Sequence, residues 1–461
     1  MKKIILLGAF SFLYSLNALS FTDSIPLPNE RQARWQEAEL GVLISYDLHI
    51  FDGKRYNQQL NRLTPIEDPQ IFNPSKLDVE QWVVSAKAAG ARFALLTATH
   101  ETGFALYPSD VNPYSTKILT FKDGKADLVG DFVKACRKHG VLPGIYIGLR
   151  WNSLLGVFDF HVNGTGEFRE RRERYYNQLA EGMVKELCTR YGDWFEIWFD
   201  GGAGDPAEGT PNVLPIVQKY QPNALFYWNA QVSEARWGGS ESGTIGYPNW
   251  STFPYPTMWA KHYPKILEKD FWLPKHGDST GKYFLPAMAD APLRGYKGRH
   301  EWFWEPGDEA FIYPVSSLVS MYEKSVGRNS TLILGLTPDT AGLIPAPDVD
   351  TLRAFGAQIR KRYGQALDGQ SFSKGSTHML ELSKKDSIGR IVLQEDIRQG
   401  HRIMEFRLEA EVKGKWIPIF NGSSIGHKLI VACPPELYSN RIRLRVIKAL
   451  APPALKMQAY R

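Results

Sequence analysis

Carboxylates at the ends of apolar segments are the residues of this sequence that could do chemistry. Asp200 closes the run EIWFDGG, and the two glycines after it allow a sharp change of chain direction. His100 and Glu101 close the run LLTATHE, and the segment GLRWN places Arg150 beside Trp151. An acid in such a place can act as a nucleophile or a proton donor. It can equally cap the next helix, and the histidine can equally be structural.

These segments belong to a repeated strand and helix pattern that must position their ends. Apolar runs alternate with amphipathic helical patterns that end in glycine, which predicts parallel strands joined by helices. The runs cover 41–46, 91–99, 141–149 and 195–200, and the helical patterns cover 77–90 and 128–140. The repetition favours a (β/α)8-like barrel, in which the C-terminal ends of the strands face one active site.

The pattern changes after about residue 360. Short alternating segments separated by turns replace the helical periodicity, and this is typical of antiparallel strands. The segments are THMLELS, GRIVLQED, RIMEFRLEAEV, KWIPIFN, HKLIVAC and RIRLRVIKA. We therefore predict a catalytic barrel domain at 21–360 and a C-terminal antiparallel β-sandwich at 361–461.

The composition is that of a globular protein rich in aromatic residues. Hydrophobic residues make up 43% of the chain and charged residues 23%, which excludes a disordered protein. The net charge of +6 is spread without a dense basic cluster, so we expect no nucleic-acid partner. The 13 Trp, 21 Tyr and 24 Phe suit carbohydrate binding, because aromatic rings stack on sugars, but they equally suit a large aromatic core.

Residues 1–20 are predicted to be a secretory signal peptide. Lysines at positions 2 and 3 precede an apolar run at 4–16, and residues 18–20 form a small–x–small cleavage site. Later apolar runs are too short to span a bilayer, so we expect no integral membrane segment after cleavage. The ten histidines lack HxH or HExxH spacing, so neither a metal nor a cofactor is expected. The expected location is periplasmic or secreted.

Longer motifs in a preserved order resemble glycoside hydrolase family 29, the α-L-fucosidases. They extend from about residue 35 to 430 and resemble most the branch that prefers terminal fucose on branched glycans. They include FNPSKLDVEQWVVSAKAAGARFALLTATHETGFALYPSD, GKADLVGDFVKACRKHGVLPGIYIGL, YYNQLAEGMVKELCTRYGDWFEIWFDGG, RWGGSESG and VGRNSTLILGLTPDTAGLI. The resemblance implies a retaining mechanism, in which Asp200 is the nucleophile and a second carboxyl group is the acid and then the base.

Positions that contact the sugar in that family have changed in this sequence. Ser45 stands where the family has a histidine, and His49 would replace it in part if the first strand extended that far. His100 matches the first residue of the family's His-His pair, whereas Glu101 replaces the second. A carboxylate in place of a donor should change which hydroxyls are recognised. The other expected sugar contacts are Tyr146, Trp198, Trp237, Arg294 and Trp302.

The acid/base glutamate of that branch corresponds to Met288 in the motif YFLPAMADAPLR. Methionine cannot transfer a proton, which leaves three alternatives. Another carboxyl group has taken the role, with Glu101, Glu241 and Glu301 as candidates; this loop-rich region aligns differently; or the protein binds glycans without cleaving them. Glu101 is attractive because it adjoins His100, and it would need a raised pKa to act as an acid.

The sequence therefore predicts an exo-acting, retaining, α-L-fucosidase-like glycoside hydrolase. Its substrate is expected to be an oligosaccharide or glycan that ends in L-fucose or a related L-sugar, such as L-galactose or L-glucose. The alternative is a catalytically inactive glycan-binding protein on the same scaffold, for which Met288 is the supporting feature.

Overall fold

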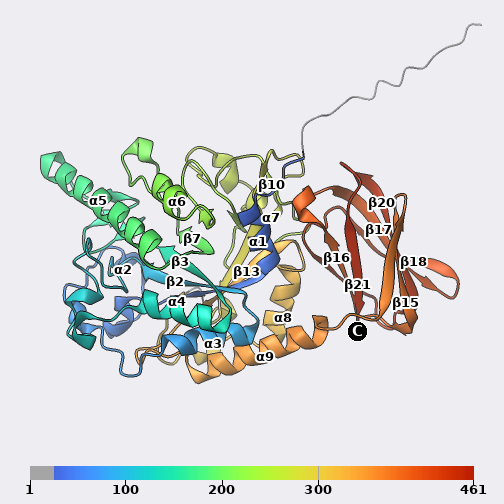
Figure 1. The fold of residues 1–461 in the computed structure, drawn as a ribbon, viewed down its shortest axis with the longest axis horizontal. Helices are drawn as coiled ribbons and strands as arrows, with labels where there is room; N and C mark the ends of the chain where they lie inside the picture. Colours follow the sequence, from blue (N-terminus) through green and yellow to red (C-terminus); the bar gives the residue numbers. More distant parts are fainter. Residues whose placement is uncertain (1–24, 300) are drawn as a thin grey trace, which may run out of the picture.

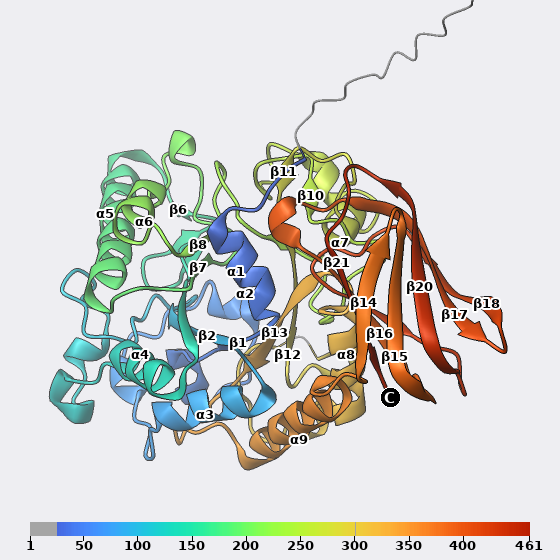
Figure 2. The ribbon, with the colours of Figure 1, turned by 45° about the vertical axis from the view of Figure 1, so that its right-hand side comes forward.

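The computed structural model describes residues 25–299 and 301–461, which form two regions lying side by side (Figures 1 and 2). The first region contains a parallel sheet covered by helices, and the second consists of antiparallel strands. The predicted signal peptide lies outside the described residues. Within the described part of the chain, the helices are all too short or too polar to cross a membrane.

Eight parallel strands form the central sheet. Neighbouring strands follow one another along the chain, and the first strand also pairs with the last, Leu40 lying opposite Leu332. A backbone hydrogen bond of 3.2 Å from Glu234 to Phe226 joins the two edges. In sheet order the strands are β8 (Leu225–Tyr227), β7 (Glu196–Phe199), β3 (Leu142–Ile147), β2 (Phe93–Thr99), β1 (Leu40–Ile44), β13 (Ser330–Leu336), β12 (Ala287–Pro292) and β9 (Arg236–Trp237). The predicted barrel-like fold is confirmed.

The predicted helices begin and end as their sequences suggest. Asp78 accepts a hydrogen bond from the backbone of the first turn of α3 (Val79–Ala89), and Gly90 ends the helix in the left-handed conformation. Asp127 and Gly140 do the same for α4 (Leu128–His139). Helix α3 packs against both α4 and α9 on the outside of the sheet (Figure 1). The remaining helices are α1 (Glu30–Ala38), α2 (Gln58–Asn61), α5 (Gly166–Arg190), α6 (Leu214–Tyr220), α7 (Trp272–His276), α8 (Val315–Lys324) and α9 (Ala346–Tyr363).

Side chains of the barrel strands alternate between two hydrophobic cores. Ile197 and Phe199 of β7 belong to the core between sheet and helices, whereas Trp198 belongs to the core inside the barrel. Because successive strand residues point to opposite faces, a residue two positions after an inward-facing one also faces inward. The alternation therefore directs Asp200, just after β7, towards the barrel interior.

The second region is an antiparallel β-sandwich, as predicted. One sheet contains β14 (Gly369–Lys374), β15 (Thr377–Ser387), β20 (Tyr438–Ala449), β17 (Ile403–Val412) and β18 (Lys415–Gly422), and the other contains β19 (Leu429–Ala432), β16 (Arg390–Glu395) and β21 (Leu455–Tyr460). Inward side chains of the two sheets, such as Leu393 and Leu444, form one core. His427 and Lys428 form ion pairs with Glu39 at the end of α1, and these ion pairs attach the sandwich to the barrel region.

Short antiparallel strands on the loops complete the fold. They are β4 (Trp151–Asn152), β5 (Val157–Phe158) and β6 (His161–Val162) after β3, and β10 (Thr252–Phe253) with β11 (Tyr283–Phe284). The loop that carries β4 to β6 begins at the same end of the barrel as Asp200.

Candidate active site

The turn after β7 aims Asp200 and leaves little room around it. Gly201 and Gly202 have φ angles of 65° and 91°, which residues with side chains rarely adopt. A Cβ atom on Gly201 would lie 2.7 Å from the Cδ atom of Arg150. The sharp turn predicted from EIWFDGG is therefore confirmed, and the glycines allow Arg150 to pack against it.

Asp200 is held by a hydrogen bond and by two nearby cations. The hydroxyl group of Tyr146 donates to Oδ2 of Asp200 over 3.1 Å. Burial raises the pKa of Asp200, while this hydrogen bond and the charges of Arg62 and Arg150 oppose the increase. These contacts favour the ionised carboxylate, which is the form that a nucleophile requires.

Two neighbouring cavities meet at Asp200. One has a volume of about 220 Å³ and is called the polar cavity here; most of its wall comes from the strand ends of β1 to β3 and from residues 301–303. The other has a volume of about 380 Å³ and is called the aromatic cavity, because eight aromatic side chains line it. Both linings include Trp198, Asp200, Glu241 and Asp290.

Most of the predicted site residues line these cavities. Glu301, His100, Tyr146 and Trp302 contribute to the polar cavity, and Trp237 contributes to the aromatic cavity. Trp302 approaches β13 so closely that a Cβ atom on Gly335 would lie 2.6 Å from its ring. Glu241, on the loop after β9, reaches both cavities, so the structure brings it together with Asp200.

Glu101 lies outside the linings of both cavities. Its side chain is buried, and both carboxylate oxygens have partners: Nε of Arg62 at 2.6 Å and the hydroxyl group of Tyr56 at 3.3 Å. Burial raises the pKa of Glu101 to about 7, although Arg62 opposes the increase. The carboxyl group has the raised pKa that an acid needs, but its partners hold it away from the cavities.

His49 was expected to replace the family's histidine in part if the first strand reached as far as residue 49, and the strand is shorter than that. β1 ends at Ile44, and His49 lies on the 3-10 helix η1 (Leu48–Phe51), so the extended spacing assumed from the sequence is wrong. His49 packs against Phe303 with a ring distance of 4.2 Å, outside the lining of the polar cavity. Ser45 itself lines the polar cavity.

Asp47 organises the two histidines of this region and was missed by the sequence reasoning. Its Oδ2 atom lies 3.3 Å from Nδ1 of His49 and 3.8 Å from Nδ1 of His100. Burial lowers the pKa of His100 to about 3, which keeps the ring neutral at neutral pH. A neutral imidazole can donate one hydrogen bond and accept another, as the recognition of sugar hydroxyl groups requires.

Arg294 also lies outside the linings of both cavities. Its guanidinium group forms an ion pair of 2.6 Å with Asp348 on α9 and a second ion pair with Asp308. All three side chains are buried. Arg294, which was predicted to contact the sugar, thus belongs to an internal ion-pair network that joins the end of β12 to α9.

The motif that contains Met288 places a different residue in the cavities. Met288 is fully buried in the barrel interior, whereas Asp290, two residues later on the same strand, lines both cavities. Nε1 of Trp237 donates a hydrogen bond of 2.9 Å to Asp290. Burial and the charge of Glu241 raise the pKa of Asp290 well above its usual range, which favours its protonated form. Alternation along a strand was the signal that could have identified it.

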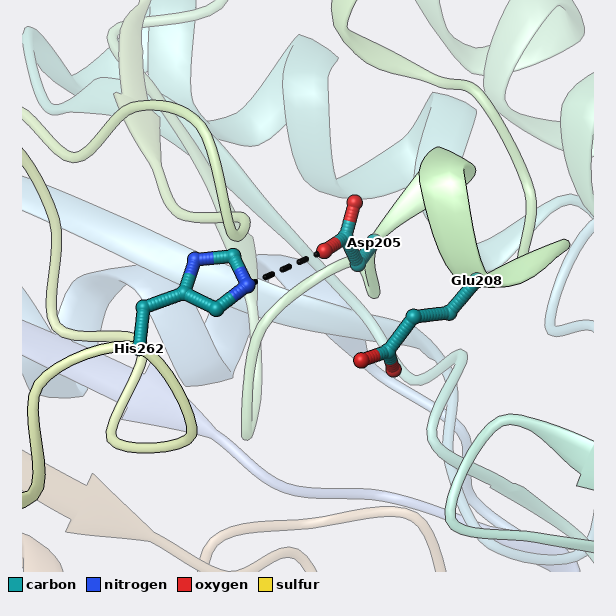
Figure 3. A group of neighbouring side chains, drawn as sticks. All are labelled: Asp205, Glu208 and His262. Atoms are coloured by element: carbon teal, nitrogen blue, oxygen red, sulfur yellow. Dashed lines mark ion pairs between the residues drawn. The ribbon is translucent and has the colours of Figure 1, made fainter.

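A group of described residues beside the aromatic cavity has side chains of the metal-binding type: Asp205, Glu208 and His262 (Figure 3). Nε2 of His262 lies 3.3 Å from Asp205, and Nζ of Lys261 lies 3.1 Å from Glu208. Both carboxylates therefore already have a partner in the protein. These pairs connect the loop after β7 to the segment that carries Trp259.

Comparison with known proteins agrees with this geometry. A family model described as Alpha-L-fucosidase matches residues 15–265, which is more than half of the chain. The structure is similar to that of a putative alpha-L-fucosidase from Bacteroides thetaiotaomicron VPI-5482, with 52% identity and a TM-score of 0.90 over 95% of this chain and 100% of that chain. A glycoside hydrolase 29 family member from an unknown rumen bacterium is 29% identical, with a TM-score of 0.78 over 95% of this chain and 77% of that chain.

A curated relative extends the likeness to plants. Alpha-L-fucosidase 1 of Arabidopsis thaliana is 27% identical over 98% of this chain and 93% of its own length. The barrel fold, the family model and these relatives lead to one conclusion: the chain belongs to the α-L-fucosidase family, glycoside hydrolase family 29.

Proposed function

We propose that this glycoside hydrolase releases a terminal L-fucose, or a closely related L-sugar, from a glycan through a covalent intermediate on Asp200. The observation that carries the proposal is the position of Asp200 at the junction of the two cavities. A nucleophile at such a junction can attack the anomeric carbon of a sugar in one cavity while the leaving group occupies the other.

The polar cavity is the binding site that we propose for the terminal sugar. Its volume of about 220 Å³ suits one monosaccharide and supports removal of a terminal residue rather than cleavage within a chain. Neutral His100 and Ser45 can exchange hydrogen bonds with hydroxyl groups, and Trp302 offers an aromatic face to the sugar ring.

Glu241 is the acid and base that we propose for the reaction. In the first step, Asp200 bonds to the anomeric carbon, the glycosidic C–O bond breaks, and Glu241 gives its proton to the leaving oxygen. In the second step, Glu241 takes a proton from water, the resulting hydroxide attacks the anomeric carbon, and Asp200 leaves. Glu241 is favoured over Glu301 because Glu241 lines both cavities, whereas Glu301 lines the polar cavity.

Asp290 supports this assignment as a neighbour of Glu241. Two neighbouring carboxyl groups, of which Asp290 is buried, do not readily ionise together, and a proton on Asp290 leaves a single negative charge on the pair when Glu241 is ionised. The protonated Asp290 can also donate a hydrogen bond to the bound sugar.

Hydrolysis of 4-nitrophenyl α-L-fucoside, α-L-galactoside and α-L-glucoside tests the proposal. The three sugars share handedness, and they differ at carbon 6 and in the orientation of hydroxyl groups. Release of nitrophenol from at least one of them is expected, with the preferred sugar showing which hydroxyl groups the polar cavity with its changed residue Ser45 accommodates. Release from none would contradict the proposal and favour the glycan-binding alternative.

We also propose export to the periplasm or beyond. The support is the charged start, apolar run and small-residue cleavage pattern of residues 1–20. In a bacterial host, N-terminal sequencing of protein released by osmotic shock should begin at about residue 21. An intact N-terminus on protein retained in the cytoplasm would contradict export.

A further inference from the structure

The aromatic cavity differs in chemistry from an ordinary sugar-binding site. Beyond the four residues that it shares with the polar cavity, its wall consists mainly of aromatic rings and aliphatic side chains, among them Trp228, Trp259, Phe271, Met258 and Leu267, together with the charged residues Arg150, Asp159 and Lys261. Sugar sites combine one or two aromatic faces with several hydrogen-bonding groups. This wall is instead apolar over most of its lining.

The apolar wall is held in place by packing. The rings of Trp228 and Trp259 lie 5.7 Å apart at 65°, and Trp259 packs in turn against Phe160 at 5.7 Å. Phe271 packs edge-on against Trp237 at 5.6 Å. The contact of His262 with Asp205 (Figure 3) and the ion pair of Lys261 with Glu208 tether the segment that carries Trp259. A preformed wall binds a flat apolar group without a large ordering cost.

Several charged and polar groups of this lining already have partners in the protein, whereas the buried indole N–H groups of Trp151, Trp198 and Trp259 have none among the described residues. Nε of Arg150 bonds to Asp159 at 2.8 Å, and Nζ of Lys261 lies 3.1 Å from Glu208. The indole N–H of Trp237 is used by Asp290. A sugar in this cavity would have to compete for the partnered groups, and the free indole N–H groups can only donate, so hydroxyl groups that donate would be left unpaired at a cost in free energy.

The edge of the cavity presents a further apolar surface. Leu267, the last residue of the 3-10 helix η6 (Pro264–Leu267), lines the cavity and is 55% exposed. A large aliphatic side chain at the mouth of a cavity loses contact with water when an apolar ligand enters. The exposed leucine therefore favours a ligand with an apolar surface over a hydrated sugar.

We infer that the aromatic cavity binds a flat apolar leaving group, so that an L-sugar attached to an aromatic aglycone is cleaved better than an L-sugar attached to another sugar. The inference rests on the proposed function, because it assigns the leaving side of the bond that Asp200 attacks. The position of the shared residues Asp200 and Glu241 places such a group directly next to the cleaved bond.

Two aryl glycosides of similar leaving-group acidity test the inference. We expect 2-naphthyl α-L-fucoside to have a kcat/KM about tenfold above that of phenyl α-L-fucoside, because the second ring buries more apolar surface. Both should exceed fucosyl-α-1,2-galactose. Equal kcat/KM values for the two aryl glycosides, or a higher value for the disaccharide, would overturn the inference.

A pair of variants connects the preference to the cavity. Leu267→Asp places a charge at the cavity mouth and should reduce the naphthyl-to-phenyl ratio of kcat/KM towards one. Leu450→Asp changes a leucine that is 50% exposed on the β-sandwich and should leave the ratio at its wild-type value. The same ratio in both variants would contradict the assignment to this cavity.

Binding separates this inference from the catalytic proposal. Quenching of tryptophan fluorescence by 2-naphthol reports occupation of the aromatic cavity whether or not hydrolysis occurs. Saturable quenching that is weakened severalfold by Leu267→Asp, in a protein that cleaves none of the glycosides, would retain the apolar site and reject the proposed function. Absence of saturable quenching would reject the apolar site, even if the fucosides were hydrolysed.

Discussion

The polar and aromatic cavities share four side chains but are built from different parts of the fold. Much of the polar wall lies on strands or within a few residues of their ends, as Thr97, His100 and Tyr146 do. Much of the aromatic wall lies on loops, as Met258 and Trp259 do. In a barrel, strand ends are fixed by the sheet, whereas loops can vary without changing it.

This difference suggests a division of tasks. Of the groups that we propose to break the bond, Asp200 directly follows β7, where strand pairing constrains its geometry, and Glu241 lies on the loop after β9. The groups that we propose to select the leaving group lie on segments held by local packing and by ion pairs such as Lys261 with Glu208. Variants of the polar cavity should therefore lower the activity on all substrates. Variants of the aromatic cavity should instead change which substrate is preferred.

The largest expected effect is that of Asp200→Ala. Loss of the nucleophile should lower kcat by about 10⁴-fold or more for phenyl and naphthyl fucosides alike, because both use the same attack on the anomeric carbon. Sodium azide should restore part of the activity by acting as an external nucleophile. Initial rates measure both effects, and circular dichroism checks the fold. Wild-type rates in this variant would reject the assignment of Asp200.

Glu241→Gln should have the next largest effect, and it should depend on the leaving group. Phenyl fucoside needs protonation of its leaving oxygen, so kcat/KM should fall by about 10²- to 10⁴-fold, whereas 2,4-dinitrophenyl fucoside should lose far less. Glu101→Gln is the matched control, because Glu101 lines neither cavity. If Glu101→Gln shows the leaving-group dependence and Glu241→Gln does not, the two roles are reversed.

Arg294→Met should affect stability rather than the choice of substrate. Removing the guanidinium group leaves Asp348 buried without its cation, while Asp308 keeps its ion pair of 2.9 Å with Arg299, so the free energy of unfolding should fall by about 3–5 kcal/mol. Arg353→Met, which removes an exposed ion pair with Asp350, should cost less than about 1 kcal/mol. Urea denaturation measures both. A large increase in KM with unchanged stability would contradict this account and support the prediction that Arg294 contacts the sugar.

Tyr146→Phe should have the smallest effect and change the pH profile. The hydroxyl group of Tyr146 stabilises ionised Asp200, so its loss should raise the pKa of Asp200 further. Because attack requires the ionised form, the acidic limb of kcat/KM should move to higher pH, while the plateau falls by less than about tenfold. A limb that moves to lower pH would contradict this account of the hydrogen bond.

Strong periodicity made much of the fold predictable from the sequence. The helices at 77–90 and 128–140 carry an Asp cap and a terminal glycine, and the apolar runs of the barrel strands stand out from their surroundings. The strand β14 was missed because the segment GQSFSK is polar and exposed, and it pairs with β15 as an edge strand. The strand β9 contains two residues, too few to show a period.

The candidate site was predictable where a side chain follows a long strand and less so elsewhere. Asp200 and His100 were found in this way. Asp290 was not predicted, although alternation along β12 directs it to the barrel interior together with Met288. The sequence could not show that Arg294 would meet acidic residues from two distant segments, since such pairing depends on how α9 packs.

Trapping the covalent intermediate tests the central claim most directly. With 2-deoxy-2-fluoro-α-L-fucosyl fluoride, the fluorine slows both steps and the fluoride leaving group favours the first, so the glycosyl-enzyme should accumulate. Mass spectrometry is expected to show one fluorofucosyl group on the protein, carried by the peptide that contains Asp200. A label on another carboxyl group, such as Asp290, or turnover of the reagent without a label, would contradict the claim.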